Sequence, residues 1–474
     1  MLVVVASKLS GVNVPLVLLL VYTVAITAFG VWIGRLVRGP ADFFVAGRKL
    51  RWPLVGATVL AANIGAGTTV GAAGLAYRDG ISAWWWNGSV GLGTLVLAFC
   101  VGPRLWTLAR DRGYLTLGDY LEDRYSAHVR GVTAGLMAVG TLAILAGQMI
   151  AGAAVLEVVA GMPRWQGVAI GGVAMTLYFT AGGLLSSAWV NAVQLAVLLI
   201  GLAIALPLVW SGVGGGAAIG ASAGVTASFW DPLYSSGAFS GWTMLILLAP
   251  GFVITPGLIQ KAYGAADARA VRLGIGVAGF AQLAFSFLPV LLGMAARVNH
   301  PGIDSQNLVL PTVMLSELPT VVGALALAAI FSAEVSTCDA ILFMLATSTS
   351  KDLYHRFVNP SASPDQLLRV ARAAALTGGV LGMVLAVQLA TIVDALRIFY
   401  AVLIATLFVP VVAALVSRRP TSRDAMVSIL GGVGAMAVVF LATDRRGWWD
   451  PGLWGLIGSA AGFSASCLVP RAKD

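Results

Sequence analysis

Two hydroxyl groups and a main-chain carbonyl share one face of an apolar stretch in the C-terminal half of the chain. Ala333, Ser336 and Thr337 stand at i, i+3 and i+4 within "FSAEVSTCDAILFMLATSTSKDLY", a spacing that places them on one side of an α-helix. Oxygen clusters of this kind suit a small hard cation such as sodium. A second interpretation stays open, because Ser and Thr hydroxyls in membrane helices also bond to their own helix or to a neighbouring one.

Further oxygen ligands are available in "AANIGAGTTVG", residues 61–71. This segment lies inside an apolar run, 53–77, that is long enough to cross a bilayer. Glycine is a poor helix former, so the step from Gly65 to Gly67 predicts an unwound segment. Carbonyls exposed there, those of Ala61 and Ile64, would complete a sodium site.

A second break is predicted in "ILLAPGFVITPGLIQ", where Pro250-Gly251 and Pro256-Gly257 interrupt another apolar run. Proline removes a backbone donor and breaks the helical ladder. Gly and Pro are common in membrane helices, but these two breaks lie about five spans apart, as in inverted-repeat transporters whose broken helices enclose a midplane site. The matched positions therefore predict a binding site between them.

The composition defines the elements that must position these groups. The chain has 474 residues, of which 59% are hydrophobic and 10% charged, with a mean hydropathy of +0.90. These values indicate an all-α polytopic membrane protein, and we expect about thirteen spans and no soluble domain. The three cysteines suggest neither disulfides nor a metal site. The predicted spans are 12–34, 53–77, 80–102, 129–158, 164–181, 185–210, 240–259, 272–296, 319–349, 367–388, 391–416, 423–442 and 450–469.

The distribution of positive charge predicts the topology. Most of the 29 Lys and Arg residues lie in or beside the loops 35–52, 103–128, 260–271, 350–372 and 417–423 or at the C-terminus. By the positive-inside rule, the N-terminus lies outside and the C-terminus in the cytoplasm of a cell-membrane protein. The net charge of +9 is thus explained without nucleic acid as a partner. The exceptions are Lys8, Arg78, Arg164, Arg297, Arg397, Arg445 and Arg446.

Carboxylates inside predicted spans are a further group of candidates, because charge in a membrane is costly and usually functional. Glu334 follows Ala333 directly and is interpreted either as a proton carrier or as a structural carboxyl. We read Asp339 as a cap or gate. Asp394 and Arg397, at i and i+3, are expected to pair with each other.

Several motifs together resemble the sodium:solute symporter family: "DFFVAGRKL", "AANIGAG", "FTAGGLLSSAWVNAVQ", "IQKAYGAADARAVR" and "AEVSTCDAILFMLATSTSKDLY". They occur in the family's order across about residues 40 to 416. The resemblance implies a LeuT-type five-plus-five inverted repeat, with one helix before the core and two after it. The implied units are 1–52 (pre-core helix and loop), 53–210 (first repeat), 211–239 (external loop), 240–416 (second repeat) and 417–474 (two final helices).

The resemblance also implies site residues. The sodium ligands would be Ala61, Ile64, Ala333, Ser336 and Thr337, and the substrate contacts would be Asn63, Gly65, Thr68, Asn87, Thr255 and Gln282. Ser332 would enter the sodium site if the motif were aligned one turn earlier. The family usually carries Asp where this chain has Asn191, so we expect one sodium ion per solute.

The predicted function is secondary active transport, in which sodium entry drives uptake of a small organic solute. The mildly polar candidate contacts differ from the many strongly polar groups expected of a sugar site. The half-helix N-terminus after the unwound stretch favours a carboxylate or amino acid, while pantothenate-like acids, sugars and nucleobases remain alternatives. A proton-coupled symporter and a membrane solute sensor are the other interpretations. We expect no enzyme and no cofactor apart from Na⁺, because the three His residues lie in loops or at helix ends. The expected partners are Na⁺, the solute and the lipid bilayer.

Overall fold

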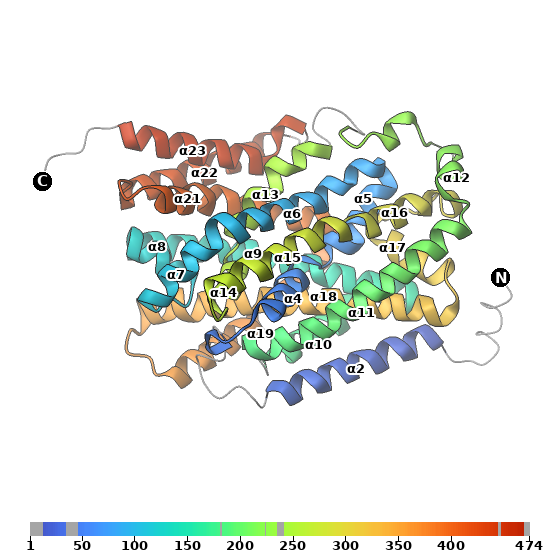
Figure 1. Ribbon diagram of the computed structural model, residues 1–474, viewed down its shortest axis with the longest axis horizontal. Coiled ribbons are helices and arrows are strands. Elements are labelled where there is room, and N and C mark those ends of the chain that lie inside the picture. Colours follow the sequence, from blue (N-terminus) through green and yellow to red (C-terminus); the bar gives the residue numbers. More distant parts are fainter. Residues whose placement is uncertain are drawn as a thin grey trace, which may run out of the picture.

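The computed structural model describes residues 13–34, 46–180, 183–222, 224–234, 241–443 and 447–468. Within those ranges the regular structure is helical, apart from a single bridge between Leu50 and Ala265. Most of the long helices run along the same axis of the molecule (Figure 1). The prediction of an all-α protein is therefore confirmed.

The first half of the chain contains two short helices where one span was predicted. Its helices are α2 (Val14–Gly34), α4 (Trp52–Asn63), α5 (Ala72–Asp79), α6 (Trp84–Val96), α7 (Gly102–Arg112), α8 (Leu117–Arg124), α9 (Ala127–Ala160), α10 (Arg164–Thr180) and α11 (Gly183–Gly212). A π-helical turn, Gly67–Gly71, precedes α5, and another, Leu97–Val101, joins α6 to α7.

The second half has a comparable interruption between α13 and α14. Its helices are α12 (Gly215–Ala221), α13 (Met244–Ile254), α14 (Pro256–Tyr263), α15 (Ala268–Phe285), α16 (Phe287–Asn299), α17 (Val309–Ser316), α18 (Thr320–Thr347), α19 (Pro364–Gln388), α20 (Ile392–Leu403), α21 (Val409–Val416), α22 (Ser422–Ala442) and α23 (Pro451–Leu468). A π-helical extension, Ser348–Val358, continues α18, and π-helical residues Ile404–Phe408 join α20 to α21.

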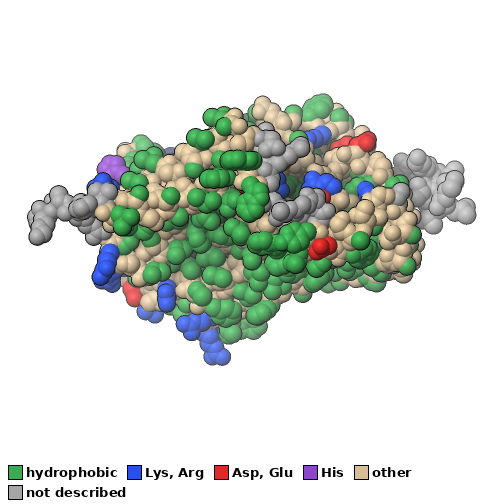
Figure 2. Space-filling view, turned by 90° about the horizontal axis from the view of Figure 1, so that it is seen from above, with side chains coloured by type: hydrophobic (Ala, Val, Ile, Leu, Met, Phe, Trp, Pro, Cys, Tyr) green, Lys and Arg blue, Asp and Glu red, His purple; other side chains and the backbone are tan. Residues whose placement is uncertain are grey.

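Nine helical segments among the described residues are long and apolar enough to cross a membrane. Helices occupy all of the predicted ranges, but the count of thirteen crossings and the inverted-repeat layout stay predictions. Hydrophobic side chains cover the middle of the face in Figure 2, while several Lys and Arg side chains gather at one end. This distribution is that of a multi-pass membrane protein.

Helices α9 and α18 form the centre of the molecule. In the most apolar 18-residue stretch of each helix, 83% is buried inside the protein, whereas the corresponding value for α22 is 28%. Helix α18 packs against α2, α4, α9 and α11, so the hydroxyl face predicted on it lies among the core helices. Helices α22 and α23 pack mainly on each other at the periphery (Figure 1).

The two long segments predicted to be external contain short helices. Helix α12 lies in 211–239, and α17 lies in the segment between α16 and α18. Residues 235–239, Lys8, Arg445, Arg446 and the last six residues lie outside the described part, as does most of the loop 35–52. The side of the membrane on which each terminus lies stays a prediction, and "outer" below means the end predicted to be external.

Candidate functional site

The first predicted break is present. Helix α4 ends at Asn63, and Ile64 has extended dihedrals, φ −96° and ψ 93°. Helical structure resumes at Gly67. The Thr68 hydroxyl accepts a bond of 3.0 Å from the Gly65 amide and donates one of 3.0 Å to the Asn63 carbonyl. The Thr68 side chain thus replaces main-chain bonds that the helix loses at this point.

Gln148 of α9 supports the same break and was missed by the sequence analysis. Its Oε1 accepts a bond of 2.8 Å from the Ala66 amide, and its side chain is almost completely buried. A Cβ atom added to Gly65 would lie 2.7 Å from that oxygen and would also collide with the Thr337 hydroxyl. Glycine is therefore required here by close packing. A single Gln within the apolar segment 127–160 was the available signal.

All five residues predicted to bind sodium come together beside this break. Ser336 Oγ lies 3.4 Å from the Ala61 carbonyl oxygen and 2.9 Å from that of Ala333. Thr337 Oγ1 lies 3.4 Å from the Ala61 oxygen and 3.2 Å from the Ile64 oxygen. The cluster joins α4 to α18 with oxygen atoms alone. Hydroxyls that link two helices and hydroxyls that ligate a cation share this geometry, so sodium binding stays a prediction.

Ser332, the candidate in the alternative alignment, lies elsewhere. Its Oγ is 2.5 Å from the hydroxyl of Tyr22 on α2. The side chain therefore contacts the helix that precedes the core instead of the broken helix. This placement favours the alignment that assigns Ser336 and Thr337 to the oxygen cluster.

The second break lies between α13 and α14. Thr255 has φ −55° and ψ 121°, and Pro256 begins the next helix. The Thr255 hydroxyl donates a bond of 2.6 Å to the Gly251 carbonyl of its own helix. The proline and glycine residues in this segment thus interrupt the helix as predicted.

Four of the six predicted substrate contacts surround the first break. Asn87 Nδ2 donates a bond of 2.9 Å to the Thr68 carbonyl, and Asn63 Nδ2 donates one of 3.0 Å to the Thr94 hydroxyl. The side-chain oxygens of Asn63 and Asn87 are buried without a partner in the described part. Such atoms are costly unless a ligand or water satisfies them.

The other two predicted contacts lie on the second half of the chain. Gln282 of α15 is fully buried, and neither of its amide atoms has a hydrogen-bond partner within the described ranges. Thr255 is half-buried and bonds within α13. Among the residues that the structure describes, no hydrogen bond links either of them to the first break, so their common role stays a prediction.

The outer side of the break is covered by large side chains. Trp86 Nε1 donates a bond of 2.9 Å to the Gly67 carbonyl. The Leu396 side chain packs so closely that a Cβ atom at Gly67 would collide with it. The rings of Phe252 and Tyr400 lie 5.3 Å apart. These residues join the two broken helices to α6 and α20.

Asp394 and Arg397 do not pair, and that prediction is wrong. Asp394 accepts a bond of 2.6 Å from the hydroxyl of Thr391, which caps the start of α20. Local capping therefore satisfies the carboxylate. Arg397 has no hydrogen bond or ion pair within the described residues, and its Nε atom is buried. It lines a cavity of about 280 Å³ together with Trp86, Tyr400 and Asp450.

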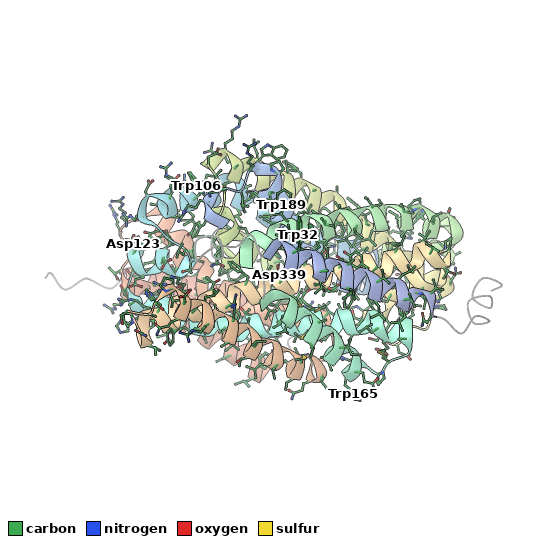
Figure 3. The ribbon with its side chains drawn as sticks, turned by 90° about the horizontal axis from the view of Figure 1, so that it is seen from below. Trp32, Trp106, Asp123, Trp165, Trp189 and Asp339 are labelled. Atoms are coloured by element: carbon green, nitrogen blue, oxygen red, sulfur yellow. The ribbon has the colours of Figure 1, made fainter. Side chains whose placement is uncertain are left out.

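Both predicted membrane carboxylates are buried on α18. Glu334 is fully buried, and its Oε1 lies 3.1 Å from the hydroxyl of Thr69. That hydroxyl also lies 2.9 Å from the Gly65 carbonyl, and it has one proton for two acceptors. If Glu334 were protonated, its carboxyl O–H could donate to the Thr69 oxygen, and the Thr69 hydroxyl could donate to the Gly65 carbonyl. Asp339 is 3% exposed and lies in the middle of the bundle, away from Asp123 at one end (Figure 3).

An ion network ties α8 and α9 to the extension of α18. The Arg130 guanidinium lies 2.8 Å from Asp119, 2.9 Å from Glu122 and 2.7 Å from Asp352. Burial alone would raise the pKa of Glu122, but Arg130 and Arg356 outweigh it, and the pKa lies below its ordinary value. The sequence analysis had used the basic residues only to predict topology and had not considered these carboxylates. Arg130 and Asp352 also line a cavity of about 510 Å³, partly open to solvent, that reaches Gln260.

Lys261 was assigned to the predicted loop 260–271, and this assignment is wrong. The residue lies in α14 and is 1% exposed. Its Nζ is 3.0 Å from the Thr58 hydroxyl of α4. Helix α14 continues past the predicted end of the span and carries the ammonium group into the protein.

Two discontinuous helices around buried polar groups define a class of secondary membrane transporters. Comparisons with known proteins agree with this class. The family model "Sodium:solute symporter family" matches residues 43–432. The chain therefore belongs to the sodium:solute symporter family, as its motifs suggested.

Individual relatives and one solved structure fit the same assignment. The chain is 24% identical to a sodium/glucose cotransporter of Vibrio parahaemolyticus, over 87% of this chain and 82% of the relative. It is 27% identical to the sodium/pantothenate symporter of Escherichia coli, over 73% and 72%. A substrate-bound Na⁺-coupled sialic acid symporter superposes with a TM-score of 0.81 at 18% identity, covering 97% of this chain and 98% of the other. That last likeness concerns the fold alone.

Proposed function

We propose that this protein couples sodium entry to the uptake of a small organic solute by alternating access. The observation that carries the proposal is the convergence of two hydroxyls and three carbonyls from α4 and α18 at the helix break. Unwound carbonyls and hydroxyls in a buried site suit sodium, because they provide the hard oxygen ligands that this ion prefers. Relatives named as sodium cotransporters support the same coupling ion.

The two ends of the site differ in a way that supports alternating access. Trp86 and Leu396 cover the outer side of Gly67. At the opposite end, the cavity of about 510 Å³ reaches Gln260 of the second broken helix. A transporter that exposes its site to one side at a time requires this asymmetry. We assign the described arrangement to an inward-facing stage of the cycle, with the N-terminus outside and the C-terminus in the cytoplasm.

Sodium coupling is tested with the purified full-length protein. We expect NaCl, and not KCl or choline chloride at equal ionic strength, to raise the unfolding temperature, because a ligand that binds only the folded state stabilises it. Reconstituted vesicles should accumulate the solute only with an inward sodium gradient. Equal stabilisation by the three salts, together with uptake independent of sodium, would reject the proposal.

For the substrate, we propose a small carboxylate or amino acid. Arg397 has no ion-pair partner among the described residues and lines the outer cavity beside Trp86 and Tyr400, where a guanidinium suits a carboxylate. Asp450 lines the same cavity, so an amino group is also accommodated. The unpartnered oxygens of Asn63 and Asn87 favour a solute that donates hydrogen bonds.

The substrate class is tested with matched pairs of solutes. Thermal unfolding with sodium is measured against small carboxylic acids, amino acids and their neutral amides, with sugars and nucleobases as further classes. We expect an acid to stabilise the protein and its amide to fail, and Arg397→Gln to remove the difference. A sugar or nucleobase that stabilises wild type and Arg397→Gln equally would reject the carboxylate assignment.

Glu334 supports a second candidate, a proton-modulated symporter. The carboxyl group is fully buried and shares the Thr69 hydroxyl with the broken helix. A proton there would alter the hydrogen bonds at the break, as described above. A pH dependence of uptake that disappears in Glu334→Gln would favour this candidate.

A further inference from the structure

A buried ammonium group lies beside the proposed sodium site. Lys261 is 1% exposed, and within the described part of the chain its Nζ makes one hydrogen bond, of 3.0 Å, to Thr58 Oγ1. An ammonium has three donors, and burying it costs free energy unless an opposite charge compensates. Asp339, also buried, is the residue whose negative charge acts on Lys261. The ammonium of Lys261 is therefore a fixed positive charge near the proposed sodium site, and the predicted set of sodium ligands gives it no role.

The position of this ammonium follows from the two helices that flank it. Thr58 precedes the proposed ligand Ala61 by three residues on α4, and Asp339 follows the proposed ligand Ser336 by three residues on α18. Three residues correspond to a rise of about 4.5 Å along a helix. The Lys261 ammonium and a sodium ion held by the oxygen cluster are therefore near neighbours, about one helical turn apart.

The structure contains a carboxylate that both cations can use. Asp339 lies on the same helix as Ser336 and Thr337, and its negative charge acts on Lys261. Without sodium, the ammonium compensates the buried carboxylate. With sodium bound, two positive charges share one nearby negative charge, and their repulsion is poorly screened inside the protein.

We propose that Lys261 is a tethered cation that competes with sodium for the negative charge of Asp339 and so weakens sodium binding. This inference rests on the proposed sodium-coupled function. A weakened site releases sodium more readily into the cytoplasm, where the ion is scarce compared with the outside. The ammonium also keeps the empty site neutral, which allows the sodium-free protein to return to its outward-facing state without a buried unpaired carboxylate.

The test is a sodium titration of the full-length protein, followed by thermal unfolding with choline chloride to keep the ionic strength constant. Lys261→Gln removes the charge and keeps a group that can bond to Thr58. We expect its sodium affinity to rise about tenfold or more, because a like charge about one helical turn away no longer repels the ion. Lys261→Arg retains the charge and should stay within about threefold of wild type, which makes it the matched control. An unchanged sodium affinity in Lys261→Gln would overturn the proposal.

A second pair of variants keeps the test decisive if Lys261→Gln does not fold because Asp339 is left without a counter-charge. Asp339→Asn alone and Asp339→Asn with Lys261→Gln are compared with each other. We expect the double variant to bind sodium about tenfold more tightly, since only the single variant retains the repelling ammonium. Equal affinities in the two proteins would contradict the inference.

The failure of this inference is distinguishable from the failure of the proposed function. If sodium does not stabilise even the wild-type protein, the sodium-coupled function is wrong. If sodium stabilises wild type and Ser336→Ala abolishes the effect, but Lys261→Gln binds sodium as wild type does, the function stands and the role assigned to Lys261 is refuted.

Discussion

Replacing Thr337 with valine tests the oxygen cluster with little change in shape, because the two side chains differ mainly by the hydroxyl group. Thr337 Oγ1 lies between the Ala61 and Ile64 carbonyls, at 3.4 and 3.2 Å, and the residue is 5% exposed. Water has little access to replace the lost ligand. Ser336→Ala removes the second hydroxyl, which lies 2.9 Å from the Ala333 oxygen.

The expected magnitude follows from the loss of one polar contact to a charged group. Such a contact is worth about 1.5–3 kcal/mol, and each 1.4 kcal/mol corresponds to about a tenfold change in affinity. Each variant should therefore bind sodium about ten to a hundred times more weakly. Loss of the hydroxyl also leaves buried carbonyls with fewer partners, so the sodium-free protein should unfold at a lower temperature as well.

The assay must separate these two effects. Unfolding temperature is measured as a function of sodium concentration, and uptake is measured at low and high sodium. A weakened site shifts both curves to higher sodium concentration. A general loss of stability lowers the unfolding temperature at every sodium concentration but leaves the sodium concentration of half-maximal effect unchanged. Ser332→Ala, which removes a hydroxyl bonded to Tyr22, is the control. Normal transport at low sodium by both Thr337→Val and Ser336→Ala would refute the proposed site.

Four further predictions concern stoichiometry, protons, packing and the ion network. Sodium-dependent uptake should show a Hill coefficient near one, because Asn191 cannot ionise; a charge-to-solute ratio that requires two ions would contradict this. Glu334→Gln should leave uptake nearly unchanged if the carboxyl is structural, and loss of a pH dependence with normal sodium affinity would show instead that it carries a proton. Gly65→Ala should reduce sodium affinity and stability, since its methyl group would meet Gln148; normal sodium titrations would argue against the tight break. Arg130→Ala should destabilise the protein by about 3–5 kcal/mol, because the buried Asp352 carboxylate loses its partner. Because the pKa of Glu122 lies below its ordinary value, the stability that this carboxylate contributes is present at neutral pH and is lost as pH falls through that pKa, which acid unfolding of wild type and variant measures.

The helix breaks and the hydroxyl face were predictable from sequence because local chemistry determines them. Gly65 is a poor helix former, and Pro256 cannot continue the hydrogen-bond ladder of the preceding helix although it can begin a new one. The spacing of Ser336 and Thr337 fixes their common face before any packing is known. These features needed only the backbone period and residue type, and the structure places the first break beside the hydroxyl face.

The wrong or missed predictions concern polar side chains whose partners depend on tertiary packing or on competition with a neighbouring group. Asp394 and Arg397 have the spacing of an ion pair, but Thr391, at the same separation on the other side of Asp394, caps the helix and donates its hydroxyl proton to the carboxylate. Lys261 follows a predicted span, and only the packing of α14 against α4 and α7 shows that its side chain is buried. Gln148 is a single polar residue in an apolar run, and its partner, the Ala66 amide, becomes available only because the other helix unwinds.

The indole of Trp86 gives the protein a native optical reporter. Its N–H donates to the Gly67 carbonyl at the point where the broken helix resumes, and the ring is 2% exposed. Tryptophan emission depends on the polarity around the indole, so any step that separates α6 from the broken helix would admit water and move the emission to longer wavelength. The difference spectrum between wild type and Trp86→Phe would isolate this signal from the other tryptophans. Opening and closing of the outer side can thus be followed in real time without an attached dye.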